Sequence, residues 1–209
     1  FVTGRSKRSI VDHFDKAYEV ETELALRHKD KLLTQVQNIL PHHVTCLYIR
    51  QAEALGLGHA VLCAQAAVGS EPFAVVLADD LIDAPKGALS QMIETYNQTG
   101  SSVLGVETVA PEQTGSYGIV EIADWQNYQR IQSIVEKPKP EEAPSNLAVV
   151  GRYILTPRIF ELLHNTPRGA GGEIQLTDAI AQLLEYEPVL AHAFDGVRYD
   201  CGSKIGYLE

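Results

Sequence analysis

The residues of this sequence best suited to chemistry are carboxylates that follow strand-like segments. Asp79 and Asp80 come directly after the apolar residues 73–78, and in open α/β sheets the carboxyl ends of strands border the ligand crevice. Asp200 ends a second short segment, residues 197–200. Carboxylate oxygens suit Mg²⁺, which usually takes one or two of them together with substrate phosphates. A turn at Asp79 and a helix cap at Asp200 would explain the same residues, so both interpretations stay open.

Glu136 and Lys137 form a second group of candidates at the end of another predicted strand. The Lys137 ammonium could supply a positive charge to a phosphate, and the Glu136 carboxylate could accept hydrogen bonds from sugar hydroxyls. An exposed charged turn is the alternative. Gly118 and Gly151 lie in or beside strands, where a ligand or a second backbone often approaches closely. A β-bulge would explain either glycine equally well.

The segment from Gln51 to His59 contains Gly56 and Gly58 after a predicted strand. Backbone groups left open by these glycines, together with the Gln51 amide, could pair with the edge of a pyrimidine, although a plain turn is the alternative. The glycine-rich loop 169–172 has neither the Walker spacing with its lysine nor the GxGxxG pattern of dinucleotide-binding sites. No histidine or cysteine cluster has zinc-ligand spacing. These patterns argue against a zinc site and the common nucleotide-binding loops, and they leave a magnesium and sugar phosphate site as one interpretation beside the structural alternatives.

Charge and composition exclude several classes of partner. The formal net charge is −10, which disfavours a general attraction to nucleic-acid phosphates. The longest apolar runs are far shorter than the roughly 20 residues that span a membrane. The three cysteines, Cys46, Cys63 and Cys201, show no CxxC spacing, so we expect reduced thiols. We therefore expect a cytoplasmic protein that binds neither nucleic acid nor membrane.

The elements that must position the candidate residues are expected to alternate between helices and strands. Helices are predicted over residues 18–40, with a break near 28–31, and over residues 59–68, 89–96, 157–164 and 173–187. Strands are predicted over residues 43–51, 73–78, 102–109, 117–123, 130–136, 146–155 and 189–194. The alternation indicates an α/β fold with a mostly parallel sheet, in which residues 73–78 are a buried parallel strand. After Pro111, strands follow one another without helices, which indicates an antiparallel annex.

Eight segments in order along the chain resemble the bacterial UTP-glucose-1-phosphate uridylyltransferases, also called UDP-glucose pyrophosphorylases. They are residues 2–7, 56–61, 77–80, 117–120, 135–139, 143–153, 172–180 and 200–207. The resemblance implies a Rossmann-like mixed sheet of the nucleotidyltransferase type, with helices on both sides and a small antiparallel annex. It implies one nucleotidyltransferase domain over residues 1–209 that is incomplete at both ends, because the family's glycine-rich phosphate loop would precede Phe1 and further C-terminal helices would follow.

The resemblance also implies a role for each matching residue. Gln51 and Gly56 would contact uracil, and Gly118, Glu136 and Gly151 would border glucose. Asp79 and Asp200 would ligate Mg²⁺, and Lys137 would bind the phosphate group of glucose 1-phosphate. The implied reaction is attack of the sugar phosphate on UTP to give UDP-glucose and pyrophosphate, in a homo-oligomeric enzyme. Two alternatives remain: a sister enzyme that uses dTTP or another sugar phosphate, and a non-catalytic module that binds nucleotide sugars.

Overall fold

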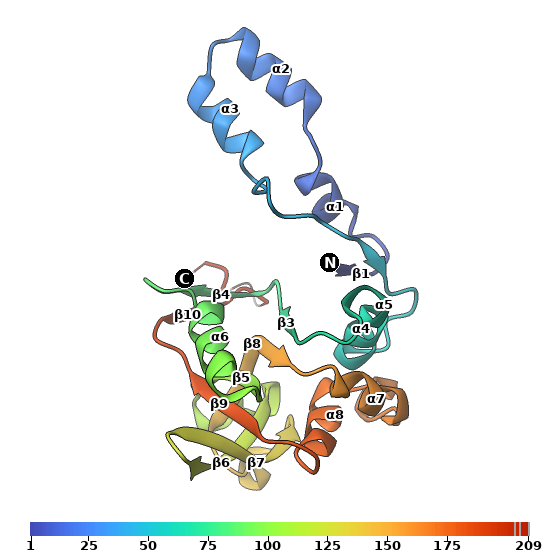
Figure 1. Ribbon diagram of the computed structural model, residues 1–209, viewed down its shortest axis with the longest axis vertical. Helices are drawn as coiled ribbons and strands as arrows, with labels where there is room; N and C mark the ends of the chain where they lie inside the picture. Colours follow the sequence, from blue (N-terminus) through green and yellow to red (C-terminus); the bar gives the residue numbers. More distant parts are fainter. Residues whose placement is uncertain (203, 205, 209) are drawn as a thin grey trace. The chain divides into compact units, whose positions relative to one another are not determined.

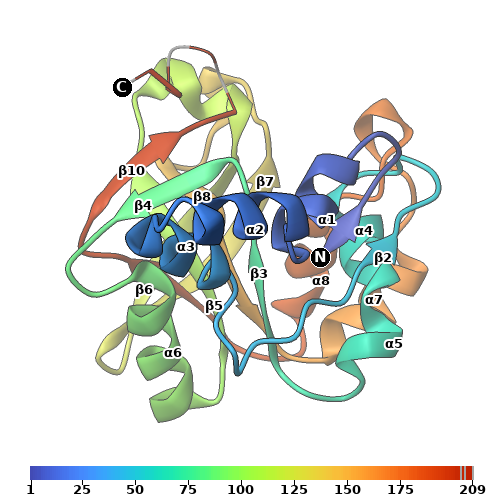
Figure 2. The same ribbon diagram turned by 90° about the horizontal axis from the view of Figure 1, so that it is seen from above.

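The computed structural model describes residues 1–202, 204 and 206–208 of the 209-residue chain. The chain divides into two compact units, an N-terminal unit of Phe1–Ala54 and a C-terminal unit of Leu55–Glu209. Figures 1 and 2 label the helices and strands of both units. The helix that a cap at Asp200 would begin falls partly outside the described residues. Within those residues, no helix is long and apolar enough to cross a membrane.

The N-terminal unit consists of two short parallel strands and three helices between them. Its elements are β1 (Val2–Thr3), α1 (Arg8–Phe14), α2 (Tyr18–Leu26), α3 (Asp30–Gln37) and β2 (Ile49–Arg50). The predicted break in the helical segment is confirmed, because α2 and α3 are separate helices that lie side by side (Figure 1). The strand predicted over residues 43–51 is mostly wrong. Only Ile49 and Arg50 pair with β1, since a β ladder needs a partner and β1 is two residues long.

The C-terminal unit is built on a six-stranded mixed sheet in the order β3-β8-β5-β9-β7-β6, and β6 also pairs with β8. The strands are β3 (Phe73–Val76), β5 (Ser102–Thr108), β6 (Gly118–Trp125), β7 (Tyr128–Glu136), β8 (Leu147–Leu155) and β9 (Val189–Ala193). The prediction of a mostly parallel sheet is wrong. Strands β5 and β9 pair in parallel, whereas β8 runs antiparallel to its neighbours β3, β5 and β6. The mixed sheet implied by the family resemblance is confirmed.

The apolar strand before Asp79 differs from its prediction. Strand β3 lies at the end of the strand order and pairs antiparallel with β8. Its alternate residues are exposed, and Val76 is 52% exposed. A short apolar run is typical of a fully buried strand, but the same run also serves an edge strand that is covered on one face only. The position of β3 at the sheet edge leaves its C-terminal end open toward the following aspartates.

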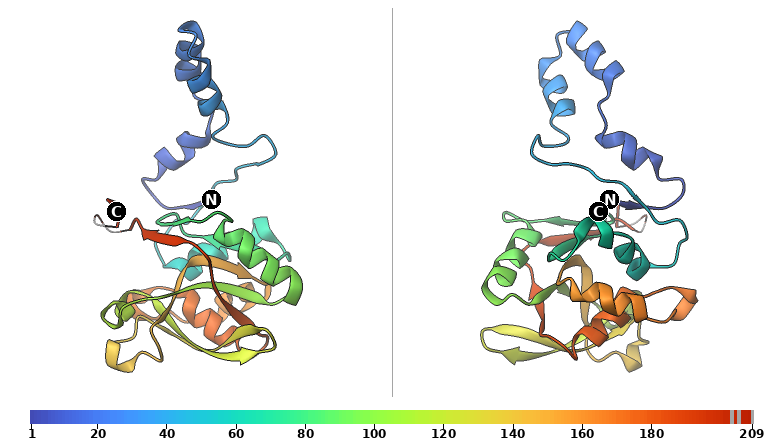
Figure 3. Two further views of the ribbon diagram at one scale, coloured as in Figure 1. Left: turned by 90° about the vertical axis from the view of Figure 1, so that its left-hand side faces the viewer. Right: turned by 45° about the vertical axis from the view of Figure 1, so that its right-hand side comes forward.

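Helices cover both faces of the main sheet. Helices α4 (Leu57–Cys63), α5 (Gln65–Val68), α7 (Arg158–Asn165) and α8 (Leu176–Leu183) pack with one face, and α6 (Ala88–Thr99) packs on the other. The two faces follow from the alternation of side chains along a strand. In β5, Val103 belongs to the cluster under α6, whereas Leu104 belongs to the larger cluster with α7 and α8. Figures 1 and 3 show α7 and α8 together against the sheet.

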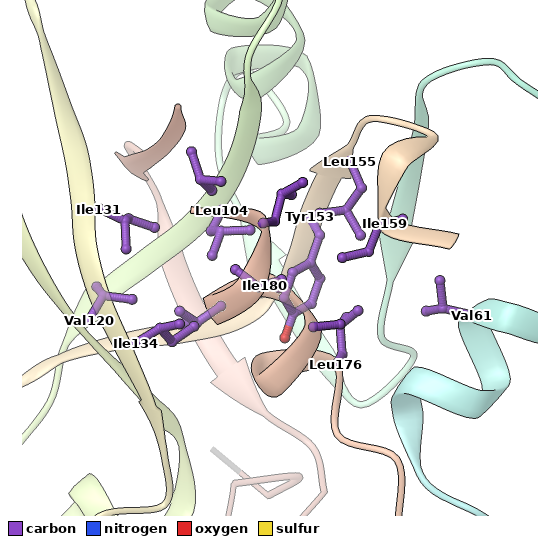
Figure 4. Close-up of a cluster of buried hydrophobic side chains, with 14 of the residues drawn as sticks. Val61, Leu104, Val120, Ile131, Ile134, Tyr153, Leu155, Ile159, Leu176 and Ile180 are labelled. Atoms are coloured by element: carbon purple, nitrogen blue, oxygen red, sulfur yellow. The ribbon is translucent and has the colours of Figure 1, made fainter. Parts of the chain in front are cut away.

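The larger core cluster holds the site's supporting elements in place. Figure 4 shows Leu104, Tyr153, Ile159 and Ile180, which come from two strands and from α7 and α8, converging on one another. The rings of Phe73 and Phe160 stack with their centroids 4.9 Å apart. Each fully buried side chain of this size contributes about 1.5–3 kcal/mol relative to exposure. The core therefore fixes β8 and α8, from which several residues of the site extend.

The antiparallel annex is present, but other strands form it. Strand β4 (Asp80–Asp83) pairs antiparallel with β10 (Val197–Asp200) in a separate two-stranded sheet, visible in Figure 2. The strands expected to form the annex, β6, β7 and β8, instead belong to the main sheet, because β7 pairs with β9 and β6 with β8. The remaining short elements are the 3₁₀ helices η1 (Pro111–Ser116), η2 (Pro140–Glu142) and η3 (Ala170–Gly172).

Candidate functional site

A cavity of about 350 Å³ in the C-terminal unit is lined by most of the residues selected from the sequence. Six of those residues line it: Asp79, Gly118, Glu136, Lys137, Gly151 and Asp200. They come from the end of β3, from β6, β7 and β8, and from β10. Gly56 is adjacent to the lining residue Leu57 but does not line the cavity itself. Gln51 belongs to the N-terminal unit and is not a lining residue.

The pairing of β4 with β10 brings the two predicted metal-binding aspartates to the same place. In this pair Asp80 lies opposite Asp200, and the backbone N–H of Cys201 donates to the Asp79 carbonyl at 2.7 Å. A Cβ atom built on Gly202 would lie 3.1 Å from Oδ1 of Asp200 and 3.3 Å from Oδ2 of Asp79. The carboxylates of Asp79 and Asp200 therefore border one small space, where a side chain larger than glycine would intrude.

The donor set at this point fits Mg²⁺. Within the described part of the chain, no group of three histidine, cysteine, aspartate or glutamate side chains could hold a metal ion. Asp79 and Asp200 offer two carboxylates, and Mg²⁺ commonly combines one or two carboxylates with substrate phosphates and water. Carboxylate oxygens are also the hard ligands that this ion prefers. The two aspartates could thus hold the ion together with a phosphorylated substrate.

Asp80, the neighbour of Asp79, forms hydrogen bonds to other residues of the protein. It is only 8% exposed. Its Oδ2 accepts a hydrogen bond from the backbone N–H of Gly151 at 2.6 Å, and its Oδ1 accepts one from Nε of Arg198 at 2.5 Å. Its carbonyl accepts a further bond from Arg152 at 2.5 Å. Asp80 therefore anchors the annex to β8.

Arg198 is the centre of a buried polar network that the sequence did not reveal. Its side chain is 7% exposed and contacts Asp80, Glu107 and Asp200 at N···O distances of 2.5, 3.4 and 3.6 Å. Its guanidinium also lies 5.1 Å from the ring centroid of Tyr117. Burial alone lowers the pKa of Arg198, but its hydrogen bonding with Tyr117 and the charge of Asp80 raise that pKa above its ordinary value. The guanidinium stays charged beside the acidic groups.

Two further residues of β8 support the same wall of the cavity. Arg152 donates to the carbonyls of Leu77 at 3.2 Å and of Gly151 at 2.8 Å. Burial lowers the pKa of Arg152, and the charge of Asp80 opposes this effect. Tyr153 lines the cavity, where burial and the negative charge of Glu136 raise the pKa of its hydroxyl. The Tyr153 hydroxyl therefore keeps its proton at neutral pH and can donate a hydrogen bond.

Glu136 and Lys137 line the same cavity from the C-terminal end of β7. Gly118 is the register partner of Glu136, and the Thr177 hydroxyl of α8 donates to Oε2 of Glu136 at 2.6 Å. Nζ of Lys137 lies 3.8 Å from Oε1 of Glu136, and its side chain is 59% exposed. Lys137 has a φ of 45°, in the left-handed region that a residue with a Cβ rarely adopts. Such strained residues cluster at functional sites.

The glycines at the cavity have distinct structural roles. A Cβ on Gly151 would lie 2.4 Å from Oδ2 of Asp80 and 2.7 Å from Cβ of Leu77, so this glycine makes room for the Asp80 carboxylate. A Cβ on Gly118 would lie 3.3 Å from the Thr177 hydroxyl. Gly56 has a φ of +91°, and a Cβ there would lie 2.8 Å from Cβ of Glu173. The close approach of Asp80 and Leu77 is therefore sufficient to explain why residue 151 is a glycine.

The comparisons with known proteins agree in their family assignment. A family model described as nucleotidyl transferase matches residues 6–209. A UTP-glucose-1-phosphate uridylyltransferase of Pseudomonas aeruginosa is 49% identical over 213 residues, which cover 100% of this chain and 75% of the relative. The Escherichia coli protein of the same name is 48% identical over 218 residues, covering 100% of this chain and 71% of the relative.

Solved structures give the same result. An apo UDP-glucose pyrophosphorylase superposes with a TM-score of 0.91 at 44% identity, covering 99% of this chain and 77% of that chain. A UDP-glucose pyrophosphorylase complexed with UDP-glucose superposes with a TM-score of 0.87 at 43% identity, covering 99% and 76%. A UTP-bound UGPase from Acinetobacter baumannii superposes with a TM-score of 0.89 at 45% identity, covering 99% and 73%.

Proposed function

Because the chain belongs to the nucleotidyl transferase family, among the UTP-glucose-1-phosphate uridylyltransferases, we propose that its cavity transfers a uridylyl group from UTP to glucose 1-phosphate. The products are UDP-glucose and pyrophosphate. One observation carries the proposal beyond family membership: Asp79 and Asp200 border one space in a cavity whose lining also includes Glu136 and Lys137. Acidic groups for a metal and a cation for a phosphate are the charges that this reaction needs.

The reaction is a displacement at the α-phosphorus of UTP. A phosphate oxygen of glucose 1-phosphate forms the new bond to that phosphorus, and the bond from it to the bridging oxygen of the β-phosphate breaks. The electron pair leaves with pyrophosphate, so no covalent enzyme intermediate is needed. Both reactants are anions and repel each other. The residues of the site must therefore hold the reactants in line and offset their negative charge.

In this proposal Lys137 and Glu136 bind the sugar phosphate. The Lys137 side chain is more than half exposed, and its ammonium offsets the charge of the phosphate group as a point cation. Glu136 accepts hydrogen bonds from glucose hydroxyls through its carboxylate, whose orientation is set by the bond from Thr177. Gly118 keeps the space beside Glu136 free of a side chain. The protonated Tyr153 hydroxyl is a further donor on the cavity wall.

Asp79 and Asp200 would hold Mg²⁺ against the phosphates of UTP. When bound, the ion neutralises phosphate charge that develops on the leaving group. The aspartates themselves fix where the triphosphate can lie relative to Lys137. We also propose, on the family resemblance, that Gln51 and Gly56 contact the uracil and that residues 1–209 form one nucleotidyltransferase domain of a cytoplasmic homo-oligomer.

The decisive experiment measures UDP-glucose formation by the purified protein from UTP and glucose 1-phosphate with Mg²⁺. Parallel reactions with dTTP and ATP separate a uridylyltransferase from a sister enzyme, because the expected rate is highest with UTP. Calorimetric titration with UDP-glucose is run on the same sample. Binding of UDP-glucose without turnover of any nucleotide would instead identify a non-catalytic nucleotide-sugar module.

A further inference from the structure

Each nitrogen of the buried Arg198 guanidinium faces a polar group of the protein. Nε donates to Oδ1 of Asp80 at 2.5 Å, and Nη1 donates to Glu107 and to the Tyr117 hydroxyl, each at 3.4 Å. Nη2 lies 3.6 Å from Oδ2 of Asp200. Each of the three nitrogens therefore has a protein partner, and the side chain is 7% exposed. Arg198 lines the cavity, but its charge is already shared among these acidic partners, which favours a supporting role over direct binding of a substrate phosphate.

The same contacts reach the proposed metal ligand Asp200 by two routes. Arg198 faces Oδ2 of Asp200 directly, and it also donates to the Tyr117 hydroxyl, which in turn donates to that same oxygen at 3.0 Å. The other oxygen, Oδ1, accepts from the backbone N–H of Gly202 at 3.0 Å. The Asp200 carboxylate is thus held in one orientation from both sides. Asp200 itself is 42% exposed along its side chain, so it needs such support.

We propose that Arg198 is a positioning residue, which acts with Tyr117 to hold the Asp200 carboxylate in the orientation that binds the metal ion. This inference rests on the proposed function, in which Asp200 is a metal ligand. Outer-shell partners of this kind orient metal-binding carboxylates and affect metal affinity strongly. Arg198 also lets Asp80 and Asp200 approach across the β4–β10 pair, because its charge offsets their mutual repulsion.

A lysine cannot replace Arg198 in this role. The planar guanidinium contacts Asp80 through one nitrogen and Asp200 through another, whereas a lysine ammonium is a single point charge on a flexible stem. Arg198→Lys therefore keeps the charge and loses the geometry. Tyr117→Phe keeps the ring under the guanidinium and removes only the hydroxyl that bonds to Asp200.

The chain offers a matched control in Arg158. This arginine also pairs with a glutamate, Glu187, at 3.5 Å and also lies over a tyrosine ring, Tyr186, at 5.4 Å. It lines a different cavity from the one that holds Asp200. Arg158→Lys therefore tests an arginine-to-lysine change with similar contacts but no link to the proposed metal site.

The test measures Mn²⁺ binding by electron paramagnetic resonance, with UDP-glucose present and pyrophosphate absent so that no turnover occurs. Free Mn²⁺ and its complex with UDP-glucose are calibrated in protein-free samples, and circular dichroism checks folding. We expect Arg198→Lys to raise the dissociation constant of Mn²⁺ by about 10- to 100-fold. Tyr117→Phe changes it in the same direction, and Arg158→Lys matches the wild type. The Mg²⁺ concentration for half-maximal activity shifts in parallel.

Wild-type Mn²⁺ affinity in folded Arg198→Lys and Tyr117→Phe proteins would overturn the positioning role. If Arg198→Lys does not fold, Tyr117→Phe decides the matter alone, because it removes one hydroxyl and keeps the ring. Failure of the proposed function would give a different result. The wild-type protein would then form no UDP-glucose, whatever the Mn²⁺ affinities of the variants.

Discussion

The backbone N–H of Gly151 donates a hydrogen bond of 2.6 Å to Oδ2 of Asp80, and no side chain larger than hydrogen fits between them. This contact joins strand β8 of the main sheet to the first residue of β4. Replacing Gly151 with alanine would place a Cβ 2.4 Å from that same oxygen. The two strands would have to separate to admit the methyl group.

We therefore predict that Gly151→Ala lowers the free energy of unfolding by about 1–3 kcal/mol, as overpacking in a close-packed site does. Urea denaturation followed by circular dichroism measures the change. The matched control is Gly87→Ala, because no atom lies within 4 Å of a Cβ at that position. The control should stay within about 0.5 kcal/mol of the wild type. Equal stability of the two variants would contradict the structural role given to Gly151.

Asp200→Asn tests the acidic pair. The substitution keeps the size of the side chain and removes the negative charge that a metal ion needs. We expect the rate of UDP-glucose formation at saturating Mg²⁺ to fall by about 10³-fold or more, which corresponds to several kcal/mol of transition-state stabilisation. Asp83→Asn on strand β4 is the control, because Asp83 is exposed and lies outside the lining of the cavity. A rate in Asp200→Asn within tenfold of that control would be incompatible with the ligand role.

The variant Lys137→Gly separates the effect of Lys137 on stability, through its backbone strain, from its effect on catalysis. Lys137 has a φ of 45°, which costs a residue with a Cβ about 1–2 kcal/mol. Glycine relieves this cost but loses about 0.5–1 kcal/mol in conformational entropy. We expect the free energy of unfolding to rise by a few tenths to about 1 kcal/mol, and kcat/KM for glucose 1-phosphate to fall by about 100-fold or more.

Gln126→Gly is the control for that prediction. Gln126 also has a positive φ, 55°, and lies in the turn between β6 and β7. Its substitution should change the free energy of unfolding in the same direction and leave kcat/KM unchanged. Urea denaturation and initial-rate assays measure both quantities. A similar loss of activity in both glycine variants would assign the effect to the hairpin backbone and not to the Lys137 ammonium.

His192 gives the protein a dependence of stability on pH. Burial lowers the pKa of His192 below its ordinary value of 6.5, and its Nδ1 lies 3.1 Å from the Thr95 hydroxyl. The unfolded chain therefore binds a proton more readily than the folded protein. Stability should fall as the pH drops through about 6.5 toward the lower pKa of the folded state, and then become independent of this group. His192→Asn should reduce that slope in urea titrations between pH 7 and pH 5, and an unchanged slope would exclude His192 as its source.

Part of the site could be predicted from residue types and part could not. Asp79 and Lys137 follow strand-like segments, and both line the cavity. The rule that carboxyl ends of strands border ligand sites located Asp79, whereas β7 runs opposite to β3, so the same rule does not bring Lys137 to that edge. The partners of Arg198 were not predictable, because Asp80 and Glu107 reach it only through the pairing of β4 with β10 and the packing of β5. One signal was available: Arg198 lies two residues before Asp200, so the alternation of a strand puts both on one side.

The fold was predictable to a similar extent. The spacing of Leu89, Met92 and Tyr96 predicts helix α6, which the structure confirms, and Gly100 with a φ of +65° ends it in a left-handed turn. Strand order was not predictable in the same way. An apolar run such as that of β3 does not specify whether its neighbour is parallel or antiparallel, and the insertion of β8 beside it depends on contacts between distant segments.

The pairing of β4 with β10 joins residues that are synthesised far apart in time, so the acidic pair can be completed only near the end of this sequence. Asp79 and Asp80 leave the ribosome well before the residues of β10 that complete their surroundings. Contacts between distant segments form late, because a long loop must close before they provide any stabilisation. A nascent chain that already contains the six strands of the main sheet still lacks Arg198 and Asp200. A chain of that length holds neither the acidic pair nor the arginine that orients it.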